Sequence, residues 1–92
     1  MYVGVKHRIT DPDRFFSGTA EEVAQNAPPG VTGRQFLPSK DRTAAICLWE
    51  GDSVDAVRDY VDSVTGDASE NEYFEISEEY AFGLPEAAAA GA

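Results

Sequence analysis

The order in which apolar periodicities change along this chain constrains its fold more than any other feature. Four runs alternate apolar and polar residues with period two, which is typical of strands, and two stretches between them have helical character. In chain order, the sequence predicts strand, helix, strand, strand, helix and strand at residues 2–9, 11–27, 31–37, 43–50, 52–64 and 72–82. This order indicates a single α+β domain.

The βαββαβ order is typical of the ferredoxin-like fold, a four-stranded antiparallel sheet with two helices on one face. A chain of 92 residues is long enough for one core and too short for two. We place the domain at residues 1–84 and expect a flexible Ala/Gly tail at 85–92. Because this fold carries many unrelated activities, function has to be argued from individual residues.

The two predicted helices differ in regularity. The second has an apolar stripe at helical spacing, with Asp52 as the expected N-cap, Gly66 as the expected C-terminal cap, and Val54, Val57, Val61 and Val64 on the stripe. The first begins with Asp11 and Pro12, but Gly18 interrupts it and Thr19 to Glu22 forms a second capping box. The pattern fits either one helix with a weak point or two short helices.

Charge and cysteine content exclude several classes of protein. The chain has 17 acidic and 7 basic residues, a net charge of −10, so we expect binding neither to nucleic acid nor to an anionic membrane. No apolar run approaches the ~20 residues of a membrane span, and the lone Cys47 excludes an internal disulfide. These features predict a cytoplasmic protein. Abundant Asp and scarce Lys fit either a high-GC genome or a salt-rich cytosol.

Strand alternation divides the sheet residues into two sets. We expect the uniformly apolar set to meet the helices: Val3, Val5, Ala44, Ile46, Leu48, Phe74 and Ile76. The other set mixes aromatic, basic and polar residues: Tyr2, Lys6, Arg8, Arg34, Phe36, Thr43, Cys47, Trp49, Tyr73, Glu75 and Ser77. By the same parity, His7 and Cys47 are expected on opposite faces.

The aromatic side chains of the mixed face would be exposed to water on an isolated sheet, and packing against a second copy of the chain would bury them. We therefore expect a homodimer whose two sheets pack face to face. Over residues 2–82 the chain resembles the dimeric α+β barrel superfamily, which includes cofactor-independent monooxygenases, small stress-responsive proteins and metal-binding members. Residues 45–58 also resemble the strand-to-helix junction of small bacterial members, some of them described as nickel-binding.

The mixed face supplies a candidate ligand site. Basic and aromatic side chains together suit a flat apolar body that carries a carboxylate or phenolate, and the candidate residues are Lys6, Arg8, Arg34, Phe36, Trp49 and Tyr73. The alternative is cross-strand charge pairing of Lys6 and Arg8 with Glu75 and Glu79.

His7 and Cys47 are the candidate metal ligands. Imidazole and thiolate suit nickel, zinc or copper, with Glu50, Glu75 or Glu79 as oxygen donors. The alternative is a structural histidine and a buried, apolar cysteine. Nucleophilic catalysis by Cys47 requires a base close by, and His7 is the chain's one histidine.

Three functions remain open at this point. The first is a dimeric protein that binds a small aromatic or anionic molecule, or assists a partner, without a cofactor and without established catalysis. The second is a cofactor-independent monooxygenase-like enzyme, and the third is a metal-binding protein of the nickel type. The sequence leaves open whether the protein is an enzyme.

Overall fold

The computed structural model describes residues 1–85. Seven elements follow one another along the chain: β1 (Tyr2–Ile9), α1 (Pro12–Phe15), α2 (Ala20–Gln25), β2 (Val31–Pro38), β3 (Ala44–Gly51), α3 (Val54–Thr65) and β4 (Ser69–Glu75). Apart from Pro85, the predicted tail lies outside the described residues.

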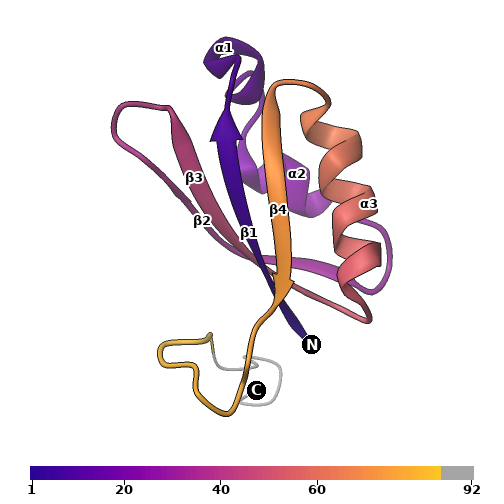
Figure 1. Cartoon of the computed structure of the whole chain (residues 1–92). Coiled ribbons are helices and arrows are strands. Elements are labelled where there is room, and N and C mark those ends of the chain that lie inside the picture. The colour runs from indigo at the N-terminus through magenta and orange to yellow at the C-terminus, as the bar shows by residue number, and fades with distance from the viewer. Residues whose placement is uncertain (86–92) are drawn as a thin grey trace.

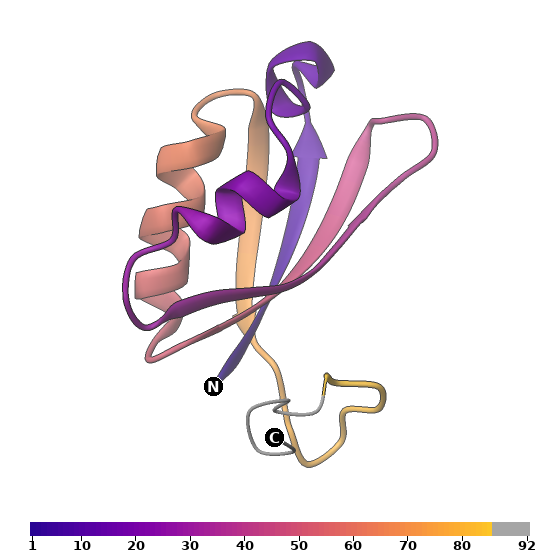
Figure 2. The ribbon, with the colours of Figure 1, turned by 180° about the vertical axis from the view of Figure 1, so that it is seen from behind.

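The strands form one antiparallel sheet in the order β2-β3-β1-β4. Figure 1 looks onto the face of the sheet that carries no helix, and Figure 2, from behind, shows α2 and α3 in front of the other face. We call these the open face and the helix face. The predicted α+β class with a four-stranded antiparallel sheet is confirmed, and the arrangement is compatible with a ferredoxin-like fold. None of the helices in residues 1–85 has the length and apolar character needed to cross a membrane.

Local capping explains where the helices begin and end. The Asp11 side chain accepts a hydrogen bond from the Arg14 backbone and starts α1, and the predicted capping box of Thr19 and Glu22 starts α2. The stretch at 11–27 is therefore two short helices. The N-cap of α3 is Ser53 and not the expected Asp52, whereas Gly66 is the predicted C-terminal cap, with φ of 56°.

Strand β4 begins and ends earlier than predicted. Residues 69–71 already pair with β1, from Ser69 opposite Ile9 to Asn71 opposite His7, and pairing stops at Glu75. The following segment, 76–85, leaves the sheet and extends beyond its lower end in Figure 1. It returns far enough for the Pro85 carbonyl to accept a hydrogen bond of 3.0 Å from the Tyr2 hydroxyl.

The core lies between the sheet and the helices. Its buried cluster combines small aliphatic residues with one large aromatic: Val3, Val5, Val31, Trp49, Val57 and Val61. Trp49 is only 6% exposed and meets Tyr60 of α3 edge to face, with ring centroids 5.8 Å apart. The Tyr60 hydroxyl donates to the Val23 carbonyl and so joins α3 to α2.

The predicted division of β2, β3 and β4 between the two faces was wrong. Val5 pairs directly with Cys47 on one side and with Tyr73 on the other, which places all three on the helix face. The same register places Ile46, Leu48 and Phe74 on the open face. Alternation determines which residues of one strand share a face, but the phase between strands depends on the register. In this protein Phe36, Trp49 and Tyr73, which were expected on the mixed face, lie on the helix face.

The open face therefore carries an exposed apolar strip. Leu37, Ile46 and Phe74 are 54%, 52% and 45% exposed. Beside the strip, Lys6 pairs with Glu72 at 3.8 Å and Arg8 with Glu70 at 2.5 Å. Charge pairing across β1 and β4 was expected with Glu75 and Glu79, and the partners differ because β4 begins earlier in the chain.

Candidate functional site

A half-enclosed cavity of about 740 Å³ lies on the helix face. Strands β1, β2 and β3 form its floor, α1, the connection to α2 and α2 itself form its roof, and the C-terminal half of α3 closes one side. The volume is in the range of small-molecule sites, roughly 300–1,000 Å³. This cavity is the candidate site.

Aromatic rings form much of the cavity wall. Phe15 and Phe16 meet edge to face, with centroids 5.0 Å apart, and lie 6.1 and 6.3 Å from the ring of Phe36. The cap at Asp11 fixes the start of α1 and so places the two neighbouring phenylalanines, while Phe36 comes from β2. Trp49 lines the floor. Such surfaces favour flat apolar molecules.

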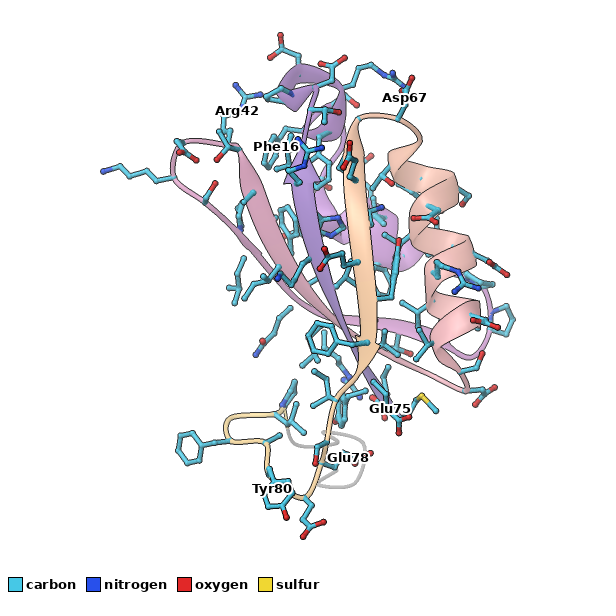
Figure 3. All side chains as sticks on the ribbon, in the orientation of Figure 1. Phe16, Arg42, Asp67, Glu75, Glu78 and Tyr80 are labelled. Atoms are coloured by element: carbon cyan, nitrogen blue, oxygen red, sulfur yellow. The ribbon has the colours of Figure 1, made fainter. Side chains whose placement is uncertain are left out.

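Ion pairs hold the roof at the end of the cavity where α1 lies. The Arg42 guanidinium lies 5.1 Å from the centre of the Phe16 ring and 3.3 Å from the Asp13 carboxylate, which joins the β2–β3 turn to α1. Figure 3 shows Phe16 and Arg42 together at this end of the molecule. Arg14 pairs with Asp67 in the turn before β4.

His7 and Cys47 form the polar centre of the floor. The Nε2 atom of His7 lies 2.9 Å from the Cys47 sulfur, and both residues line the cavity. His7 is 4% exposed, and its ring meets Phe15 edge to face at 5.2 Å. The expectation that the two residues lie on opposite faces was wrong, because pairing of Val5 with Cys47 gives His7 and Cys47 the same parity.

Asn71 fixes the tautomer of His7. The amide nitrogen of Asn71 donates to the Asp62 carboxylate at 3.0 Å and to the Thr65 hydroxyl at 2.9 Å. Because a carboxylate only accepts, the amide oxygen must face His7, 2.7 Å from Nδ1. Nδ1 therefore carries the proton, and Nε2 of the neutral ring accepts a hydrogen bond from the Cys47 thiol.

Burial keeps this pair uncharged. It lowers the pKa of His7, although the hydrogen bond to Asn71 and the negative charge of Asp62 oppose the shift. Burial also raises the pKa of the Cys47 thiol to about 12. At neutral pH the site holds a neutral imidazole and a thiol, and not an imidazolium–thiolate pair.

Arg34 reaches the cavity from an irregularity in β2, where the register shifts between Gly33 and Gln35. Its Nε and terminal nitrogen donate to one oxygen of Glu50 at 2.9 and 2.6 Å. This partly buried pair offsets the positive charge of Arg34.

The structure separates the six residues of the predicted ligand site. Arg34, Phe36 and Trp49 line the cavity. Tyr73 lies on the same face of the sheet but donates its hydroxyl to Asp62. Lys6 and Arg8 lie on the open face, in their pairs with Glu72 and Glu70.

Sequence reasoning missed two contributions to the site. Phe15 and Phe16, which line the cavity, and Asn71, which bonds His7, were not among the residues predicted for the ligand or metal site. An uncharged polar residue between Glu70 and Glu72 is the signal that could have identified an inward position on β4.

The candidate metal ligands His7 and Cys47 do come together, but as a hydrogen-bonded pair. Within residues 1–85, no group of three or more His, Cys, Asp or Glu side chains is arranged to hold a metal ion. The pair alone offers two ligands, fewer than the three or four protein ligands of most transition-metal sites.

No protein-family model, curated protein or solved structure matches the chain. The cavity and the residues around it therefore carry what can be inferred about its function.

Proposed function

We propose that the protein binds a small, flat, mainly apolar molecule in the cavity between the α1–α2 roof and the sheet. The observation that carries this proposal is the lining of the cavity. Phe15, Phe16, Phe36 and Trp49 surround a volume large enough for a ring system, while His7 and Cys47 supply a small polar centre. Such a combination of aromatic wall and few polar groups is typical of ligand sites.

Charge in the cavity favours an uncharged ligand over an anion. Of the basic residues expected to attract an anion, Lys6 and Arg8 lie on the opposite face of the sheet, and Arg34 is paired with Glu50. Arg14 lines the cavity but is paired with Asp67. A bound carboxylate would have to compete with these acidic partners.

Trp49 allows a direct test, because it is the chain's one tryptophan and lines the cavity. Neutral aromatic compounds such as nitrobenzene and 4-nitroanisole are expected to quench its fluorescence in a saturable way. Phe36→Ala removes part of the wall and should weaken binding severalfold. Ser63→Ala is the control, since Ser63 lies on the exposed side of α3, away from both the cavity and the open face. Absence of saturable quenching, or equal loss in both variants, would refute the proposal.

We further infer that the open face is the interface of a homodimer, in which two sheets pack face to face as in a dimeric α+β barrel. The exposed strip of Leu37, Ile46 and Phe74 gives the apolar centre of such an interface. A two-fold interface must complement itself. Here the basic residues Lys6 and Arg8 on β1 lie beside the acidic residues Glu70 and Glu72 on β4. A second copy related by a two-fold axis can therefore place its acidic residues opposite these basic ones.

Sedimentation velocity tests the dimer. The wild type is expected to sediment as a dimer at micromolar concentration, and Ile46→Lys, in the centre of the strip, as a folded monomer. Ser63→Lys, on the exposed side of α3, adds the same charge and should leave the dimer intact. A monomeric wild type would exclude this interface.

A further inference from the structure

We propose that Nε2 of His7 is the polar anchor of the cavity and accepts a hydrogen bond from a weakly acidic hydroxyl group, as in a phenol or an enol. This inference rests on the proposed function and names its ligand class. Three features support it. Asn71 fixes the tautomer of His7 through Nδ1, the Cys47 thiol is a weak donor to Nε2, and aromatic side chains surround the pair.

The hydrogen bonds of Asn71 mean that Nε2 of the neutral His7 ring can only accept a hydrogen bond. To move the proton from Nδ1 to Nε2, the ring would have to present a lone pair to the Asn71 oxygen, 2.7 Å away. Turning the Asn71 amide to avoid this would set its oxygen against the Asp62 carboxylate. Ser69 also donates to the Asn71 oxygen, at 2.7 Å, and holds the amide in place. A ligand that meets Nε2 must therefore donate.

The present partner of Nε2 is one that a ligand can displace. A thiol is a weak donor, whereas a phenolic or enolic hydroxyl is a stronger one. Cys47 loses little when its hydrogen bond is broken, because an unpaired cysteine behaves as a small apolar side chain. Exchange of S–H for O–H at Nε2 is therefore favourable, and both residues line the cavity.

The surroundings narrow the ligand class further. The ring of Phe15 lies 5.2 Å from that of His7, so a ligand bound to His7 would lie beside aromatic side chains. A carboxylate has no proton to give to Nε2 and would face the lone pair of an uncharged ring. A neutral hydroxyl on a flat ring satisfies both the wall and the anchor.

The experiment compares 4-nitrophenol with its methyl ether, 4-nitroanisole, which keeps the ring but cannot donate. Both are titrated by Trp49 fluorescence into wild type, Cys47→Ala and Cys47→Ser, below the pH at which the free phenol ionises. Wild type should bind the phenol more tightly than the ether. Cys47→Ala removes the competing donor and should raise this preference roughly fivefold, as expected for one hydrogen bond. Cys47→Ser keeps a donor and should not raise it.

A second readout follows the anchor itself. As the chain has one histidine, its ¹⁵N signals are unambiguous. Free protein should show Nδ1 protonated, and the phenol, unlike the ether, should shift the Nε2 signal. Because the cavity takes up the neutral phenol, the visible phenolate absorbance near neutral pH should also fall on binding.

Each outcome decides between the two proposals. If the ether binds as tightly as the phenol in all three proteins, the cavity is a ligand site but the His7 anchor is refuted. If the phenol binds as its coloured phenolate, or Nε2 proves to be protonated, the anchor is likewise refuted. If neither compound binds, the proposed function fails and the anchor fails with it.

Discussion

Alkylation of Cys47 tests the electrostatics of the site directly. The thiolate is the reactive form of cysteine, and burial raises the pKa of this thiol from 9.0 to about 12. Three pKa units correspond to a thiolate fraction about a thousandfold lower at neutral pH. Iodoacetamide should therefore label native protein at least about a thousandfold more slowly than protein unfolded in urea. Since Cys47 is the only cysteine, the mass of the adduct reports this one site.

The pH dependence of the labelling rate distinguishes a neutral His7–Cys47 pair from an imidazolium–thiolate pair. With a neutral pair, the native rate should rise about tenfold for each pH unit above neutrality, because the thiolate fraction does. Low urea concentrations show whether labelling proceeds through unfolding, in which case the rate rises steeply with urea. Fast, stoichiometric labelling with a flat profile would mean that His7 already holds the thiol proton. That result would refute the neutral pair and favour a catalytic thiol.

Three further predictions concern stability. The lowered pKa of His7 means that the unfolded chain binds the proton more tightly, so the contribution of His7 to the free energy of unfolding should be constant above pH 6.5 and fall as the pH drops below it; urea titrations from acid to neutral pH check this, and His7→Asn should lose the effect. Gly51→Ala should cost about 1–3 kcal/mol, because its Cβ would lie 2.9 Å from Val57, whereas Gly18→Ala, with no contact under 3.8 Å, should change stability by under about 0.5 kcal/mol. Trp49→Ala should cost about 3–5 kcal/mol in the same assay, and a loss below about 1 kcal/mol would contradict its place in the core.

Because Trp49 lies in the core, substitutions at this position cannot test the proposed dimer interface. On sequence grounds Trp49 was expected on the mixed face, the predicted dimer interface, where a substitution such as Trp49→Glu would be expected to give a monomer. In the structure Trp49 lies in the core, so this substitution would bury a charge and unfold the chain. Ile46, at 52% exposure, is the residue that tests the interface.

Local signals along the chain were enough to predict the elements and the fold class. The cap at Asp11, the capping box at Thr19 and Glu22, and Gly66 after α3 each act through hydrogen bonds or dihedral angles within a few residues. Such interactions are readable from sequence because both partners are neighbours in it. The period of each strand is a local property for the same reason.

Only the tertiary structure decided which face each strand presents to the helices, and with it the site. One step of register between β1 and β3 moves Trp49 and Cys47 from one face of the sheet to the other, and nothing within either strand reports that step. The pairing of Val5 with Cys47 brings Cys47 to His7, 40 residues away, and β4 brings Asn71 to the same ring, 64 residues away. The candidate site depends on these contacts between distant segments, whose geometry is set by the packing of the whole sheet.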